Sequence, residues 1–304
     1  MIDLSRNGYS HEQVKEVLHM VRGSRQIRFR YFLLDKNENE IGEISHLVES
    51  GSIENQAFAE IKRTAKFRLK DSRFIDNNGE EREINWITDR IQVFVEFKVP
   101  DQFEQVEETS NKKEGGWVDF SLGIFILSSP TRKEEGRSVY REVEAYDKLL
   151  IVKEDKVTER YTIPAGTKYY NAMVQVLTSA GITKYNIEND EKTLPTDKEF
   201  DPGTEKLAIL NDLASDLGFT QLWVDEYGYF RTSRYRPPEE QATDYIYEDD
   251  DISIIYPGTE EEMDLFDLPN VFVVTVANPD TEEEFVSVVE NTNPDHPRSI
   301  PNLG

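Results

Sequence analysis

The chain has 304 residues, too long for one small core, so two or three domains are expected. It carries 60 acidic and 35 basic side chains, a formal net charge of −25, which disfavours stable nucleic-acid binding because phosphates are neutralised by Lys and Arg. The absence of cysteine excludes disulfides, thiolate nucleophiles and sulfur-ligated zinc. Neither a membrane-spanning apolar run nor an N-terminal signal sequence is present, which favours a soluble product.

The first predicted element is a short amphipathic helix. Ser10 is a favourable N-cap with Gln13 at the capping-box position, and apolar residues follow at helical spacing until Gly23. Because this helix precedes the first strand, we expect residues 1–25 to form an N-terminal arm. The arm would pack against its own barrel or against a neighbouring subunit.

Strands dominate residues 26–150, where apolar and polar residues alternate between turns rich in Asn, Asp or Gly. The predicted strands lie at 27–34, 41–50, 65–70, 91–99, 118–126 and 139–146. The last two form the best-specified hairpin of the chain, because five apolar residues recur at every second position of its first strand. Several half-buried strands in about 120 residues predict a first β-barrel domain.

The turn DKNENE between the first two strands resembles the start of a calcium loop, with Asp35, Asn37 and Asn39 at alternate positions. The sixth position should be glycine and is Glu40, and the twelfth should be a bidentate glutamate and is His46. An ordinary hairpin turn is therefore the favoured interpretation.

Helical spacing replaces alternation after residue 150. One helix is predicted from Thr167 to Gly181 and a second from Thr204 to Gly218, and a hairpin that turns at residues 226–228 follows. Two helices against short strands indicate a small α+β domain at 151–240. The predicted fold class is therefore β-dominated α+β.

The dipeptide Pro237-Pro238 marks the boundary of a last segment, residues 241–304. Its three predicted strands, ISIIY, NVFVVTV and EEFVSVV, cannot close a domain alone. They either return to the first barrel or begin a second, incomplete one. The ending IPNLG carries no stop signal, so we expect a longer parent protein.

Six stretches of the chain carry a resemblance to a known family. They are FLLDKNENEIGEI, IKRTAKFRLKD, GIFILSSPTR, REVEAYDKLL, RYTIPAGTKY and DPGTEKLAILNDLASDLGF. Together with their spacing they resemble the tail-associated hub proteins, of the tail-associated lysin type, of bacteriophages that infect Gram-positive hosts. The resemblance covers most of residues 27–275.

This resemblance implies a structural role in the virion. It implies a homotrimeric ring at the tail tip or baseplate that continues the tail tube, contacts the distal tail protein ring and the tape-measure protein, and passes DNA to the host. Synthesis would take place in the bacterial cytoplasm. Enzymatic or sugar-binding activity, where the family has it, belongs to segments C-terminal to the hub.

The sequence contains no recognisable catalytic or metal-binding pattern. There is no G-x-S-x-G, no H-E-x-x-H, no P-loop and no dinucleotide fingerprint, and none of the four histidines has a nearby Ser or Asp in a recognisable arrangement. We therefore predict no enzymatic activity, no cofactor and no metal site. The run Asp249 to Asp251 could bind a hard cation, but a solvated acidic turn is favoured.

The acidic excess is uneven along the chain. Residues 237–297 hold 18 acids and no Lys or Arg, whereas residues 1–70 hold 12 bases and 10 acids. A DNA conduit needs a wall that repels phosphate, so we predict a negative lumen, although acidity that serves only solubility is the plain alternative. The candidate lumen acids are Glu248, Asp249, Asp250, Asp251, Glu260, Glu261, Glu262 and Asp264. The basic strand face of Lys66, Arg68 and Lys70 is predicted to turn toward a neighbouring subunit or ring.

A second function class remains open: a module that binds host-wall polysaccharide, or a glycoside hydrolase. Sugar sites use exposed aromatic rings beside planar polar groups. Trp86, Trp117, Trp223 and the run from Tyr227 to Phe230 could supply the rings, although core packing is the simpler use of aromatics.

Overall fold

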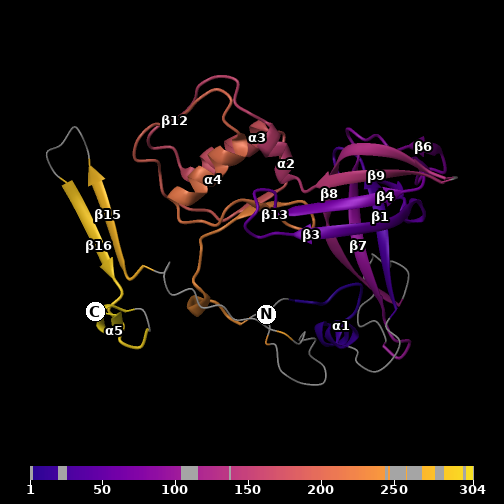
Figure 1. The fold of residues 1–304 in the computed structure, drawn as a ribbon, viewed down its shortest axis with the longest axis horizontal. Helices are drawn as coiled ribbons and strands as arrows, with labels where there is room; N and C mark the ends of the chain where they lie inside the picture. The colour runs from indigo at the N-terminus through magenta and orange to yellow at the C-terminus, as the bar shows by residue number, and fades with distance from the viewer. Residues whose placement is uncertain are drawn as a thin grey trace. The chain divides into compact units, whose positions relative to one another are not determined.

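A computed structural model describes residues 3–19, 26–103, 116–136, 138–243, 246, 258, 269–277, 284–296 and 299–303. The chain separates into two units, Met1–Glu248 and Asp249–Gly304 (Figure 1). Strands outnumber helices throughout the described residues, and the fold is the β-dominated α+β class that the sequence predicts. No described helix combines the length and the apolar character that crossing a membrane requires.

One antiparallel sheet of seven strands contains most of the residues between 27 and 146, and we refer to this part as the sheet region. Its strands run in the order β2-β1-β7-β8-β9-β4-β3. Their bounds are β1 (Ile27–Leu34), β2 (Glu40–Glu43), β3 (Val48–Asn55), β4 (Arg63–Leu69), β7 (Arg90–Lys98), β8 (Trp117–Glu135) and β9 (Ser138–Tyr146). A separate small hairpin consists of β5 (Arg73–Ile75) and β6 (Glu81–Glu83).

The seven-stranded sheet curls around a single core. Tyr31 on β1 and Phe67 on β4 have ring centroids 5.9 Å apart, although β7, β8 and β9 lie between the two strands in the sheet. In a flat sheet four strand spacings would separate β1 from β4 by about 19 Å. The 3-10 turn η1 (Ser45–Leu47) lies between the two sheet ends, since Ile44 N–H donates to Tyr31 and Lys70 N–H donates to Leu47.

The predicted N-terminal helix is present as α1 (His11–Leu18), and it packs on its own sheet. The capping box is confirmed, because Gln13 N–H donates to Ser10 Oγ at 3.3 Å and Ser10 N–H donates to Gln13 Oε1 at 2.9 Å. Val14 and Val17 are buried in a cluster that includes Val118 of β8. The helix ends before the predicted stop, and residues 20–25 lie outside the described part of the chain.

A helical region, residues 149–232, follows β9 and has its own core. Its elements are α2 (Leu149–Glu154), β10 (Tyr161–Ile163), α3 (Tyr169–Ser179), β11 (Tyr185–Ile187), β12 (Lys198–Phe200), α4 (Lys206–Asp216), β13 (Trp223–Val224) and β14 (Phe230–Thr232). The helices α3 and α4 lie side by side (Figure 1). Both are followed by the predicted stop glycines, Gly181 at φ +74° and Gly218 at φ +69°. A last 3-10 turn is η2 (Pro238–Glu240).

The second unit contains an antiparallel hairpin of β15 (Val271–Ala277) and β16 (Glu284–Glu290), and a short helix, α5 (Ile300–Leu303). Its register pairs Val271 with Glu290 and Val273 with Val288. The two later strands predicted for this segment are therefore present. The predicted strand ISIIY lies outside the described residues.

Candidate functional site

A buried ion cluster joins the β1–β2 turn of the sheet region to the helical region. The Glu38 side chain is 4% exposed, and its carboxylate lies 2.9 Å from Arg90 Nη1 and 2.6 Å from Lys184 Nζ. Lys148, equally buried, forms a third ion pair with Glu38 and donates a 2.8 Å hydrogen bond to the carbonyl of Gly228. One carboxylate thus meets three cations that come from β7, the start of α2 and the residue before β11.

The electrostatics of the cluster favour an ionised Glu38. Burial alone would raise the pKa of this carboxyl, but hydrogen bonds from Lys148 and Lys184 outweigh burial and the pKa is lowered. Burial also lowers the pKa of Lys148, and the hydrogen bond to Glu38 opposes that effect. The cluster therefore depends on its carboxylate, because without it three cations would face one another at the junction.

The turn between β13 and β14 fits the sheet region closely. Gly228 has φ +82°, and a Cβ there would lie 3.1 Å from Ile124 Cδ1 and 3.2 Å from Glu38 Oε2. Ser121 Oγ on β8 donates to the Glu226 carbonyl at 2.7 Å. Glycine is needed for the positive φ and for the close approach, so the turn is shaped to contact the sheet.

Asp147, between β9 and α2, is a second buried acid at the junction. Its carboxylate accepts hydrogen bonds from the backbone N–H groups of Arg63 and Leu149, each at 2.9 Å. Burial nevertheless raises the pKa of Asp147 to about 6, and the hydrogen bonds only partly oppose this shift.

The raised pKa predicts a pH dependence of stability. A carboxyl whose pKa is about 6 when folded and 3.8 when unfolded binds its proton more tightly in the folded state. Its contribution to stability is therefore full below the unfolded pKa and is lost as pH rises through 6. We therefore expect wild type to lose about 1 kcal/mol of unfolding free energy between pH 5 and pH 7 relative to Asp147→Asn, which does not titrate.

The measurement is urea denaturation of both proteins at pH 5, 6 and 7. Asn keeps the size of the side chain and one acceptor oxygen but does not titrate. The substitution can shift the unfolding free energy by the same amount at every pH, so the test compares how steeply the unfolding free energy of each protein changes with pH. Parallel pH profiles would contradict the prediction.

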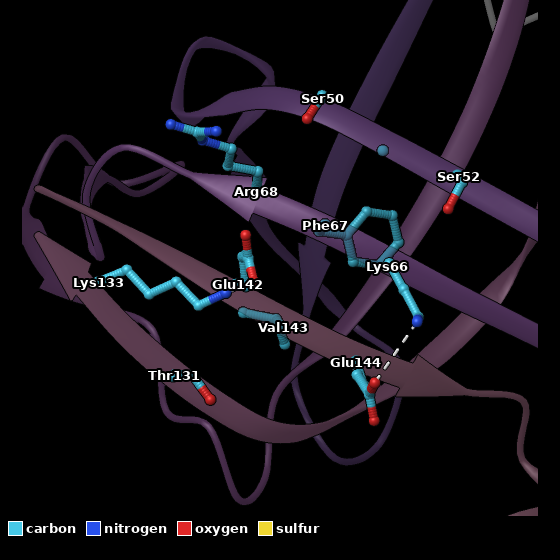
Figure 2. A pocket seen from close by; sticks show the side chains of 11 residues that line it. Ser50, Ser52, Lys66, Phe67, Arg68, Thr131, Lys133, Glu142, Val143 and Glu144 are labelled. Carbon is cyan, nitrogen blue, oxygen red and sulfur yellow. Dashed lines mark hydrogen bonds and ion pairs between the residues drawn. The ribbon is translucent and has the colours of Figure 1, made fainter. Parts of the chain in front are cut away.

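The predicted basic strand face borders an open groove on the outside of the sheet. Figure 2 shows the side chains that line it: Ser50, Ser52, Lys66, Phe67, Arg68, Thr131, Lys133, Glu142, Val143 and Glu144, with Gly51 beside them. Lys66 Nζ lies 3.7 Å from Glu144 Oε1, and Arg68 Nε lies 3.1 Å from Glu49 Oε2. Two of the three cations of the predicted basic face, Lys66 and Arg68, are therefore each paired with an acid, and Lys70 is exposed. Whether this face meets a neighbouring subunit stays a prediction.

The hairpin of the second unit exposes apolar side chains on both of its faces. Their exposed fractions lie between 38% and 62%, for Val271, Phe272, Val273, Val274, Val286, Val288 and Val289. Successive strand residues point to opposite faces, so neighbours such as Phe272 and Val273 expose apolar surface on different sides. An isolated two-stranded hairpin is marginally stable in water, and a contiguous apolar surface of this kind indicates association.

The aromatic residues that the sequence singles out fall into two groups. Trp86 packs against the core of the sheet, Trp117 has the Arg28 guanidinium 4.1 Å from its ring centroid, and Phe230 is completely buried. By contrast, Trp223 on β13 and Tyr229 immediately before β14 are each 39% exposed. Tyr227 in the turn is 45% exposed.

Some of the site residues that the sequence predicts lie in the part of the chain that the structure does not describe. The eight candidate lumen acids, from Glu248 to Asp264, lie outside the described residues.

In the β1–β2 turn, the Asp35 carboxylate accepts hydrogen bonds from the backbone N–H groups of Asn37 and Asn39, which closes an ordinary turn. Within the described ranges, no group of three or more His, Asp or Glu is placed to hold a metal ion.

Comparison with known proteins found no matching family model and no matching curated protein. Among solved structures, the chain is similar to a tail protein from Neisseria meningitidis MC58, with 9% identity, a TM-score of 0.41 and coverage of 67% of this chain and 50% of that one. It is also similar to the 43 kDa tail protein of prophage MuSo2 from Shewanella oneidensis, with 12% identity, a TM-score of 0.44 and coverage of 68% and 54%.

A third similar structure is the prophage tail protein gp18 from Listeria monocytogenes EGD-e, with 11% identity and a TM-score of 0.37. That match covers 73% of this chain and 56% of the other. The chain thus spans about half the length of the solved structures it matches.

Proposed function

We propose that this chain is a structural hub protein of a bacteriophage tail tip or baseplate, with no enzymatic role of its own. It would form a trimeric ring that continues the tail tube and passes DNA to the host. The observation that carries this proposal is the β15–β16 hairpin, whose two apolar faces need partners. A protein with that feature is suited to assembly.

The six stretches that resemble tail hub proteins support the same role. They form the β1–β2 hairpin, β4, parts of β8 and β9, β10 with the start of α3, and α4. They therefore build both the sheet region and the helical region. Two of them also supply Glu38 and Lys148, the buried pair at the junction between these regions.

The proposal extends to partners and to the conduit. The distal tail protein ring and the tape-measure protein are the expected neighbours in the tail. Acids of residues 237–297 would line the channel and repel the DNA duplex toward its axis, over a screening distance of about 8 to 10 Å at physiological salt.

Imaging of purified tails tests the proposed function. Tails from a phage that encodes this chain are labelled with an antibody raised against the purified protein and then averaged by cryo-electron microscopy. We expect the label at the tip of the tail and three-fold symmetric density that accommodates residues 27–232. Label along the tube, or a hub of two-fold symmetry, would contradict the proposal.

A further inference from the structure

The chain contains two Asn-Gly pairs, Asn7-Gly8 and Asn78-Gly79. In such a pair the backbone nitrogen of the glycine can attack the side-chain amide carbon of the asparagine before it. A new C–N bond forms, the amide C–N bond breaks, and the proton of the attacking nitrogen leaves with the amide as ammonia. Water then opens either C–N bond of the resulting succinimide ring, which gives aspartate or isoaspartate. Glycine permits the attack because it has no Cβ to hinder the approach.

The first pair is held against the sheet region. Asn7 Nδ2 donates to Asp119 Oδ1 at 2.8 Å and to the Trp117 carbonyl at 3.2 Å, both on β8. Arg6 Nη1 donates to the carbonyl of Asp119 at 3.1 Å, which fixes the same segment. To react with Gly8, the Asn7 amide would have to leave a hydrogen bond to a carboxylate, which is stronger than a bond between neutral groups. The folded structure therefore protects this pair.

The second pair lies in the turn between β5 and β6, where both residues are exposed. A Cβ added to Gly79 would meet no atom within 4 Å, so the space around this glycine is open. The Asn78 amide has a polar neighbour in the Asp76 carboxylate. The backbone N–H groups of Glu80 and Asn78 lower the pKa of Asp76 more than the Asn78 amide does. The Asn78 side chain is therefore held more weakly than that of Asn7.

Backbone hydrogen bonds, rather than the Asn78 side chain, shape this turn. The Asp76 carboxylate accepts from the N–H groups of Asn78 and Glu80 at 2.9 and 3.0 Å. Gly79 N–H donates to the carbonyl of Asp76 at 2.9 Å, so the attack requires this bond to open. A hydrogen bond in an exposed hairpin turn opens at low cost, because its opening leaves the core packed. The geometry of the turn thus delays the reaction without blocking it.

We propose that Asn78 is a site of non-enzymatic deamidation, which converts it to aspartate and isoaspartate while Asn7 stays intact. The modification adds a negative charge close to Asp76. An isoaspartate also adds one carbon to the main chain of a turn whose Asn77 N–H donates to the Ile41 carbonyl of β2 at 2.9 Å. Conversion therefore loosens this hairpin from β2. The site goes beyond the assembly role and does not depend on it.

Incubation of the purified full chain at mildly alkaline pH, followed by tryptic digestion and mass spectrometry, measures both pairs in one sample. Cleavage after Arg6 and Arg73 places them in separate peptides, residues 7–15 and 74–82. Deamidation raises the mass of a peptide by about 1 Da. In the native protein we expect peptide 74–82 to convert about tenfold faster than peptide 7–15, the factor that one hydrogen bond to a charged group supplies. In denaturing urea the two rates should become similar, because neither pair is then protected by the fold.

Asn78→Gln is the matched variant, because it keeps an exposed amide at the same position but cannot close a five-membered ring. The mass of its peptide 74–82 should stay constant. Hydrogen exchange of residues 73–83 should become faster in the incubated wild type and stay unchanged in this variant.

Fragment spectra assign the conversion to Asn78 or to Asn77. Native protein in which Asn78 stays intact while the urea sample converts would overturn the proposal. Equal conversion of both pairs in the native protein would also overturn it, and so would conversion of Asn77 in place of Asn78.

Discussion

Replacing Glu38 by Gln lowers the free energy of unfolding by about 3 kcal/mol, because it removes the carboxylate of the buried cluster and leaves Arg90, Lys148 and Lys184 facing one another. Breaking a buried ion pair by removing one partner is costly when the charge left behind stays out of water, as the 4% exposed side chain of Lys148 would. The variant should also loosen the contact between the sheet region and the helical region. Guanidinium denaturation of the purified chain, followed by tryptophan fluorescence, measures the loss.

Two further variants sharpen this experiment. Lys148→Met should cost less than Glu38→Gln, about 1 to 3 kcal/mol, because Glu38 keeps two cations and only the Gly228 carbonyl loses its donor. Glu159→Gln changes an exposed glutamate in the same way and should leave stability within about 0.5 kcal/mol of wild type. A Glu38→Gln variant as stable as this control would show that the cluster does not hold the junction.

Charges placed on the apolar hairpin should abolish assembly. Val273 and Val288 are register partners on one face of the β15–β16 hairpin, 59% and 50% exposed. The double variant Val273→Glu, Val288→Glu puts two carboxylates side by side in a surface that assembly would bury, at a cost of several kcal/mol. On the proposed function, we expect tails that lack the hub and a purified protein that does not form the proposed trimer.

The matched control is Ile87→Glu, because Ile87 is 89% exposed and lies in the other unit of the chain. Sedimentation velocity of the purified chain and infectivity of the mutant phage are the two measurements. Both hairpin positions are exposed, so the main thermal transition should be unchanged in the double variant. Normal tails from the double variant, or an equal defect from Ile87→Glu, would contradict the assigned surface.

The sequence by itself determined those elements whose start, end or exposed face depends on residues close together along the chain. The Ser10 capping box starts α1, and Gly181 and Gly218 follow α3 and α4, because these positions satisfy helix-end groups within a few residues. The alternation at 118–126 likewise predicted a half-buried strand, since side chains change face at every step. The same reasoning placed the turn between β13 and β14.

Only the tertiary structure decided which polar and aromatic residues form sites. Glu38 lies in a charged turn that sequence alone treats as solvated, yet it is buried by Arg90, Lys148 and Lys184, which lie 52 to 146 positions away along the chain. Trp117 and Trp223 are the same residue type, but the Arg28 guanidinium lies 4.1 Å from the centroid of the first ring and the Arg231 guanidinium lies 6.0 Å from the centroid of the second. Burial and pairing of this kind depend on how a curled sheet brings distant strands together, and no local periodicity encodes that distance.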